Sequence, residues 1–388
     1  MLYFSKAKLA AIYLIIVFLS LFSFANFIET KEDFILSKKI NLGLDLQGGS
    51  YLLLEVDSQP IIDRNLQEKL LQLRKYFKKN KIKYKNLKLK NKTINFHLPK
   101  QDIENFENFF LNKDNTINAY YNTYRSYEMN HSISDLGESF PNEDLINISY
   151  TKFGLIEIKN STLDQSLEIV RRRIDEVGTK EPTIIKRGSD RILIELPGLD
   201  DPNRIKKLLG KTANLTFRLV SEIEDDFGSE LLSYEEDDQQ LNISKRILLS
   251  GDNLITANPS FDNQNNETVV SFSLDRVGTK KFARATTNNV GKRLAIILDN
   301  KIMSAPLIRE PIVGGNGIIT GDFTFQSATD LALLLRSGAL PAPLNIIEER
   351  TVGPDLGEDS IKAGTFSLLI GFLLVIFYML LKYKYLGI

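Results

Sequence analysis

Two long apolar runs lie near the ends of the chain. Residues 9–28 and 363–381 contain 20 and 19 consecutive positions without a charged residue. At ~1.5 Å per residue, each run is long enough to cross the ~30 Å hydrocarbon core of a bilayer as a helix. The pattern therefore predicts two transmembrane helices, with a tail over 1–8 and the start of a further loop over 382–388.

Charges beside the runs orient the predicted helices. Both short tails carry only basic residues, whereas every acidic residue lies between the runs. The positive-inside rule then places both tails in the cytoplasm and the middle segment outside it. A cleavable signal peptide ending near Ser23 and Ala25 is the alternative for residues 1–28, but the apolar run exceeds the ~7–15 residues of a signal sequence, so an uncleaved anchor is favoured. Neither run contains an ionisable residue, so we assign no proton-relay residue in this chain.

The segment 29–150 is predicted to form a first α+β unit. Apolar residues surround Gly48-Gly49 in the sequence LGLDLQGG and lead into a strand that ends at Asp57. The spacing then predicts a helix, two strands, a helix and a short strand, at 61–80, 82–90, 93–98, 101–112 and 115–121. The order βαββαβ is that of a ferredoxin-like unit.

The same order is predicted again over residues 151–221. Phe153 to Lys159 alternates like a strand, and a helix capped by Ser161 or Thr162 ends at Gly178. The remaining elements are expected as strands at 182–187, 191–196 and 213–220 and a helix at 202–210. This second ferredoxin-like unit is predicted to be the base of the outer domain.

A composition change separates the base from the last unit. Residues 222–246 are acidic and weakly patterned, which predicts a solvated linker. Residues 247–343 are expected to form an α+β head, with a strand at 268–274, a helix from Asp275 to about Val290 and a hairpin turning at Asp299-Asn300. Residues 344–362 return to the base and the membrane. The predicted fold class is an α+β membrane protein, in which ferredoxin-like βαββαβ units and an inserted α+β head lie between two transmembrane helices.

Composition excludes several kinds of chemistry. The chain has no cysteine and two isolated histidines, His97 and His131, which leaves no thiolate or imidazole cluster for a metal or a catalytic triad. The 49 basic residues balance 49 acidic ones, which argues against nucleic-acid binding. Without the five lysines beside the runs, the middle segment holds 44 basic and 49 acidic residues and is taken to lack a polybasic stripe. We therefore predict no enzymatic activity, no cofactor and no metal.

Three local motifs are interpreted as structural. No GxxxxGK[ST] sequence occurs, so Gly48-Gly49 and the glycine-rich stretch 314–317 are assigned to positive φ or close backbone approach rather than to phosphate binding. Consecutive helix residues point ~100° apart, so Arg171, Arg172 and Arg173 are expected on a solvated face paired with nearby acids.

Four stretches together resemble the SecD family of bacterial inner-membrane proteins that assist protein export. They are LGLDLQGGSYLLLEVD, RRRIDEVGTKEPTIIKRGSDRILIELPGL, GGNGIITGDFTFQSATDLALLLRSGALPAPL and TVGPDLGEDSIKAG. They lie within about 42–57, 162–220 and 268–365, in the family's order relative to both apolar runs.

The resemblance implies a periplasmic base and a mobile head that captures and releases unfolded preprotein. It also implies SecF, the SecYEG channel and YajC as partners, SecA as an indirect one, and the proton motive force as the energy source. Family members have six spans, and their proton-linked carboxylate lies in a later one. We therefore expect this chain to be a fragment or a shortened form.

The resemblance also marks site residues. Its structural motif positions are Gly43, Asp45, Gly48, Gly49, Pro197, Gly198, Gly353 and Pro354. Phe272, Phe282 and Phe325 are the expected preprotein contacts of the head. Gly278 and Gly315 are expected to let the head adjust, with hinges near Val220 and Leu344 because a rigid-body movement needs its connections to absorb the change.

Two other functions are kept as alternatives. A transporter of the resistance-nodulation-division type would export a small molecule through a ligand pocket. A passive scaffold held by two spans would bind SecF or the channel without cycling.

Overall fold

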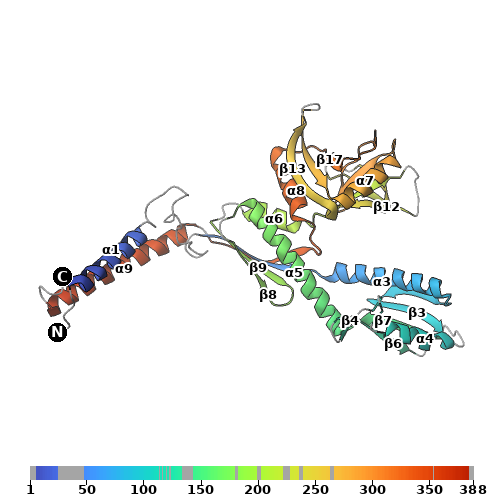
Figure 1. The fold of residues 1–388 in the computed structure, drawn as a ribbon, viewed down its shortest axis with the longest axis horizontal. Coiled ribbons are helices and arrows are strands. Elements are labelled where there is room, and N and C mark those ends of the chain that lie inside the picture. Colours follow the sequence, from blue (N-terminus) through green and yellow to red (C-terminus); the bar gives the residue numbers. More distant parts are fainter. Residues whose placement is uncertain are drawn as a thin grey trace. The chain divides into compact units, whose positions relative to one another are not determined.

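A computed structural model gives the fold of the chain (Figure 1). It describes residues 6–24, 48–112, 114–115, 117–118, 120–121, 124–132, 143–179, 182–198, 202–221, 228–235, 239–262, 266–352 and 354–383. The chain divides into two units, one of residues 1–50, 196–199 and 351–388 and one of residues 51–195 and 200–350. Each unit is described by itself.

The first unit holds the two apolar helices. Helix α1 spans Lys6–Phe24, and helix α9 spans Pro354–Tyr383 with proline at its first helical position. Within the described residues, one stretch, 359–383, is long and apolar enough to cross a membrane, while the apolar stretch 10–20 of α1 is shorter. The predicted span 363–381 lies inside α9. The predicted span 9–28 extends past the end of α1 into undescribed residues, so it stays a prediction.

A four-stranded sheet forms the base of the soluble part. Its strands lie in the order β18-β1-β9-β8. Together with helices α5 and α6 they follow the chain order β1 (Gly49–Val56), α5 (Lys152–Val177), β8 (Thr183–Arg187), β9 (Arg191–Pro197), α6 (Pro202–Gly210) and β18 (Leu344–Val352). The base is therefore assembled from three segments that are distant in sequence.

The strand predicted at 153–159 is wrong, because these residues form the first turns of α5. Thr151 caps the helix by accepting a hydrogen bond from the Gly154 backbone N–H, ten residues before the predicted cap. A Cβ at Gly154 would collide with the Ser126 carbonyl oxygen, so the glycine permits this close approach. The strand missing from the predicted unit is supplied by β1.

The segment between β1 and α5 forms a separate α+β module. Its elements are α3 (Gln59–Asn80), β2 (Lys85–Lys90), β3 (Thr93–Pro99), α4 (Lys100–Phe110), the short pair β4 (Tyr120–Tyr121) and β5 (Tyr124–Arg125), β6 (Tyr127–Ser132) and β7 (Glu143–Tyr150). An antiparallel sheet of order β2-β3-β7-β6 packs on α3 and α4 through the buried rings of Phe77, Phe96 and Phe106. The predicted first ferredoxin-like unit is wrong, because its opening strand β1 belongs to the base.

The described residues of the head form two antiparallel sheets and two helices. One sheet has the order β11-β12-β10-β15-β16, and the other has the order β13-β14-β17. The elements are β10 (Leu215–Val220), β11 (Ser229–Ser233), β12 (Gln240–Ser250), the 3-10 turn η3 (Gly251–Asn253), β13 (Leu254–Asp262), β14 (Glu267–Leu274), α7 (Arg276–Thr287), β15 (Leu294–Leu298), β16 (Lys301–Ser304), β17 (Asn316–Ile319) and α8 (Phe325–Ser337). Asp299 and Asn300 both have positive φ, as their predicted hairpin turn requires.

The acidic linker predicted over 222–246 is also corrected. Residues 229–233 form β11, and residues 240–250 form β12, which pairs with β10 in the head sheet. Among the described residues of that stretch, Ile243 is the one fully buried side chain. The sequence therefore lacks the regular alternation of apolar and polar residues that marks a strand, and its acidic side chains suggested a linker instead. The head therefore begins at β10, and strand 213–220 belongs to it rather than to the base.

Candidate functional site

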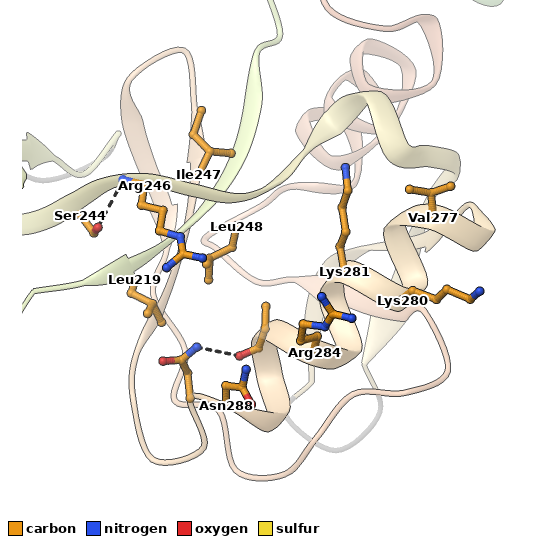
Figure 2. A pocket seen from close by; sticks show the side chains of 12 residues that line it. Leu219, Ser244, Arg246, Ile247, Leu248, Val277, Lys280, Lys281, Arg284 and Asn288 are labelled. Atoms are coloured by element: carbon orange, nitrogen blue, oxygen red, sulfur yellow. Dashed lines mark hydrogen bonds between the residues drawn. The ribbon is translucent and has the colours of Figure 1, made fainter. Parts of the chain in front are cut away.

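A groove of about 550 Å³ opens on the head between strand β12 and helix α7 (Figure 2). Leu219, Ser244, Arg246, Ile247 and Leu248 line one wall from β10 and β12. The other wall comprises α7 and the turn after it and is lined by Val277, Lys280, Lys281, Arg284, Ala285, Asn288 and Asn289.

Helix α7 turns one face to this groove. Val277, Lys280, Lys281, Arg284, Ala285 and Asn288 recur at the spacing that places side chains on a single helical stripe. The opposite face is buried through Gly278, Phe282 and Thr286. Because that face is held in the head core, the basic stripe points to solvent.

The start of α7 is fixed by a capping carboxylate. Asp275 accepts a hydrogen bond from the Gly278 backbone N–H, and the Asn253 side-chain amide donates to both carboxylate oxygens at 3.3 and 3.2 Å. These hydrogen bonds, with the Gly278 bond first, hold the pKa of Asp275 below its usual value. The cap therefore ties α7 to the turn that joins β12 to β13.

The groove combines positive charge with apolar surface. Among the described residues, no carboxylate lines the groove. Four cations do, namely Arg246, Lys280, Lys281 and Arg284. Ile247 and Val277 are 49% and 55% exposed, although they are aliphatic. Figure 2 shows Arg246 on the β12 wall and Arg284 on the α7 wall, with Leu219 and Leu248 on the β12 side. Such a surface can bind a segment that offers carboxylates and apolar side chains together.

The groove offers little for covalent chemistry. Its lining holds hydroxyl, amide and cationic groups, with no histidine, cysteine or carboxylate to act as a base for Ser244 among the described residues. The described part of the chain also contains no group of three or more metal-ligand side chains. Noncovalent binding is what this arrangement supports.

The predicted preprotein contacts do not line this groove. Phe272 and Phe282 are only 5% and 3% exposed, and both rings pack against Phe217 in the head core. They are therefore core residues, and the prediction that they contact a partner is wrong. Phe325 is 70% exposed at the start of α8. It is distant in sequence from the groove residues and does not line the groove. Val277 and Ile247, which the sequence interpretation missed, are the exposed apolar positions at the groove.

Gly278 and Gly315 are positions of close approach. A Cβ at Gly278 would lie 2.6 Å from the Asn253 Cβ, and one at Gly315 would collide with the Thr279 side chain. Gly315 also has φ +72°, which disfavours any other residue. Tight packing of this kind holds α7 in place, which differs from the predicted adjusting role.

The motif glycines meet at the start of the base sheet. Gly48 and Gly49 have φ values of +68° and +132°, as the sequence predicted for these positions. The Gly198 backbone N–H, after Pro197 at the end of β9, donates to the Gly48 carbonyl oxygen at 3.0 Å. Pro354 begins α9. Gly43, Asp45 and Gly353 lie outside the described residues.

Arg173 is a junction residue that the sequence interpretation placed wrongly on a solvated face. Its side chain is 1% exposed, and its guanidinium donates to four backbone carbonyls. These acceptors are Leu208 at 2.7 Å, Lys211 at 2.5 Å, Thr212 at 3.3 Å and Gly338 at 3.2 Å. Burial lowers the pKa of Arg173 to about 10, and the Asp299 carboxylate partly offsets this effect. One side chain on α5 thus holds both chain connections between base and head.

Two ion pairs accompany Arg173. Arg336 of α8 donates to both carboxylate oxygens of Glu176 on α5, at 3.2 and 2.5 Å. Arg204 of α6 donates to Asp330 of α8 at 2.8 Å. The base helices α5 and α6 therefore contact α8 through ion pairs. The connections run through 211–214 and 338–343, so Leu344 lies near one of them, whereas Val220 is the last residue of β10 and lies within the head. The hinges expected near these two residues stay a prediction.

Three family models match separate parts of the chain. The SecD/SecF GG motif matches residues 34–60, the N-terminal P1 domain of protein translocase subunit SecDF matches 163–222, and the SecDF P1 head subdomain matches 229–342. Eleven of the twelve residues that line the groove lie in the last of these, and Leu219 and Arg173 lie in the second.

Relatives of known name match over nearly the whole chain. Protein translocase subunit SecD of Rickettsia bellii is 42% identical over 382 residues, which cover 96% of this chain and 70% of that protein. The SecD subunit of Acetobacter pasteurianus is 38% identical over 392 residues, which cover 99% of this chain and 73% of that protein.

A solved structure also resembles this fold. The crystal structure of SecDF in its super-membrane-facing form matches with a TM-score of 0.50 and 26% identity, covering 97% of this chain and 39% of that one. The chain thus spans about two-fifths of that SecDF protein. By sequence and by fold, the chain belongs to the SecD family of protein translocase subunits.

Proposed function

We propose that this SecD-family chain assists preprotein translocation by binding the emerging polypeptide in the head groove between β12 and α7. The observation that carries the proposal is the amphipathic lining, in which four cations and exposed aliphatic side chains share one cavity. An unfolded chain offers carboxylates, apolar side chains and backbone carbonyls together, so such a surface suits it.

The cellular setting follows from the family. We propose that the chain sits in the bacterial inner membrane, with two spans and a large periplasmic domain. SecF and the SecYEG channel are the proposed partners, with YajC beside them and SecA acting indirectly. The proton motive force is the proposed energy source, and no residue described here is assigned to proton transfer.

We further propose that the base is a ferredoxin-like unit on which the head cycles. The sheet order β18-β1-β9-β8 with the chain order βαββαβ supports this assignment. Arg173, Glu176 and Arg204 hold one arrangement of base and head through polar contacts. Repacking of these contacts is the proposed step between capture and release.

Two alternatives remain distinct from this proposal. A passive scaffold would need no change at the Arg173 junction, and a small-molecule exporter would need a ligand pocket whose loss alters drug sensitivity. The names of the relatives favour protein transport over small-molecule export, and the open amphipathic groove favours binding of a polypeptide over a passive scaffold.

Binding to an unfolded polypeptide tests the proposed site. The full chain in detergent is titrated against a fluorescently labelled, reduced and unfolded secretory protein, and anisotropy gives the dissociation constant. The variant Lys280→Glu/Arg284→Glu should weaken binding at least tenfold, because it reverses two of the four groove charges.

A matched variant controls for net charge. Lys245→Glu/Lys292→Glu makes the same change at two exposed head lysines that do not line the groove. Equal affinity for the wild type and this control is expected. If both variants weaken binding to the same extent, the effect comes from overall charge and the groove is not the site.

A further inference from the structure

One part of the chain is strongly basic. Residues 69–100 contain 11 lysines and one arginine with no aspartate or glutamate, whereas the other 356 residues hold 37 basic and 49 acidic residues. This segment lies outside the stretches matched by the family models. Averaging charge over the whole outer domain concealed it, and the prediction that no polybasic stripe exists is wrong.

The structure places most of these cations on the surface of the α3–β2–β3 module. Eight have exposed side chains and no ion-pair partner among the described residues, and we call this set the lysine surface. It comprises Arg74, Lys75, Lys78, Lys79, Lys81, Lys83, Lys88 and Lys90. The other four, Lys69, Lys85, Lys92 and Lys100, have interactions of their own.

The lysine surface surrounds one edge of the module. Helix α3 buries Leu66, Leu73 and Phe77 in the module core, and the spacing puts Arg74, Lys75, Lys78 and Lys79 on its other side. On β2, Leu87 and Leu89 pack on the core while Lys88 and Lys90 alternate to the opposite face. Because β2 is the end strand of its sheet, the cations lie on both sides of that edge.

Protection of the edge strand explains only part of this set. Lysines and bulges on an edge strand discourage pairing with another chain. Strand β2 has a register shift between Lys85 and Lys88, and Asn86 there has φ +52°. That role accounts for Lys88 and Lys90, but it does not require the four cations on α3.

The chemistry of the surface points to a partner with many phosphates. Leu71, at 52%, is the one exposed large apolar side chain within residues 69–100, all of which are described, so the surface lacks the cluster of apolar anchors that peptide recognition commonly needs. Lysine ammonium groups are point charges on flexible stems, which suit an array of phosphates better than one bidentate ligand.

The same molecule carries α9, which is apolar and long enough to cross a membrane, so lipid headgroups are present at a high effective concentration. We propose that the lysine surface docks on the anionic phospholipid headgroups of a bilayer.

A single label can report this docking, because the chain has no cysteine. Leu71 is 52% exposed, and its spacing puts it on the same face of α3 as Arg74, Lys75 and Lys78. The full chain with Leu71→Cys carries a donor dye and is held in nanodiscs with an acceptor dye on the lipid headgroups. Energy transfer is compared between phosphatidylcholine discs and discs that also contain phosphatidylglycerol, at about 0.15 M salt.

Phosphatidylglycerol should raise energy transfer, and about 1 M salt should remove the increase because the Debye length falls to about 3 Å. Each cation near an anionic surface contributes about fivefold to the docking equilibrium, so Arg74→Gln/Lys75→Gln/Lys78→Gln, which changes three cations on the labelled face of α3, should lower that equilibrium on the order of a hundredfold. The matched variant Lys245→Gln/Lys292→Gln/Lys301→Gln removes the same charge from exposed head positions and should dock normally.

Three results would overturn the proposal. One is equal energy transfer in neutral and anionic discs for a chain whose circular dichroism is native. Another is a response to added polyglutamate in neutral discs without a response to phosphatidylglycerol, which would assign the surface to an acidic polypeptide. The third is the same response to inorganic phosphate in neutral discs, which would show that no lipid surface is required.

Discussion

Replacing Arg173 with methionine should open the junction between base and head. Methionine keeps an unbranched, apolar side chain but has no donor for the four carbonyl acceptors at 2.5 to 3.3 Å. Hydrogen bonds from a charged donor contribute ~1.5–3 kcal/mol each, and the four together on the order of 6–12 kcal/mol before costs.

Burial of the guanidinium opposes this gain. The fall of its pKa from 12.5 to about 10 corresponds to a cost of about 3 kcal/mol for the charged form. The exposed carbonyls of the variant would also recover water. The net loss of stability at the junction should therefore be about 3–5 kcal/mol, the range for breaking a buried charged cluster. Arg173→Lys keeps the positive charge but loses the planar set of guanidinium donors. Its junction stability should therefore lie between that of the wild type and that of Arg173→Met.

Native-state hydrogen exchange measures this loss locally, which avoids treating several domains as one two-state unit. The reporter is the Leu340 backbone N–H, which donates to the Thr212 carbonyl at 2.7 Å across the two connections. Its exchange should accelerate on the order of a hundredfold or more in Arg173→Met.

The control is Arg171→Met on the same helix. Arg171 is exposed and its guanidinium lies 3.6 Å from Glu168, so its loss should change stability by less than ~1 kcal/mol. If Arg173→Met changes exchange at Leu340 no more than this control does, the reasoning about the junction is refuted.

Further predictions concern packing and pH. Gly278→Ala should destabilise the head by ~1–3 kcal/mol, measured by thermal unfolding, because its Cβ would lie 2.6 Å from Asn253; Gly210→Ala, which meets open space, is the control. Asp275→Ala should lower the melting temperature at pH 7. Since the pKa of Asp275 is depressed in the folded state, that difference should shrink as the pH falls through this lowered pKa, and a constant difference would contradict the capping role. Tyr127 donates to Tyr150 at 2.7 Å, and burial raises the pKa of both phenols. Their contribution to stability should be present below pH ~10 and be lost above it, and Tyr127→Phe should flatten this loss in an alkaline unfolding series.

Local signals in the sequence anticipated many elements but not their partners. The helix ending at Gly178, the turn at Asp299-Asn300 and the positive φ of Gly48 and Gly49 follow from residue type alone, and the structure confirms them. Membership of β1 in the base sheet depends on contacts with β9 and β18, more than a hundred residues away. Periodicity within a window carries no information about such pairing, so two contiguous ferredoxin-like units were predicted wrongly.

The burial of Arg173 was indicated by the spacing of apolar residues on α5, but the sequence interpretation gave more weight to the run of three arginines. Arg173 lies three residues after Val170 and four before Val177, which places it on the apolar stripe of α5. Its position within Arg171-Arg172-Arg173 suggested a solvated face, yet only Arg171 and Arg172 pair there with Glu168. A charged residue on an apolar stripe indicates a buried cluster of acceptors.

The predicted contact residues of the head were assigned wrongly for a similar reason. Phe272 alternates with Val270 and Leu274 on β14, and this period already indicates an inward side chain. Aromatic character was given more weight than strand phase. The groove could not be predicted, because it forms where β12 and α7 face each other across a distance of about thirty residues in sequence.

Photo-crosslinking to a chain in transit tests the central claim most directly. A photoreactive amino acid at Val277 or Ile247 probes the groove, and one at Leu231, which is 67% exposed on β11 and does not line it, is the control. Membrane vesicles carry the variant together with the other Sec components and a secretory protein stalled midway through export. The account predicts crosslinks from Val277 and Ile247 that vanish when the stalled chain is released, with none from Leu231. Crosslinks from Leu231 as strong as those from Val277, or none from either groove position, would contradict it.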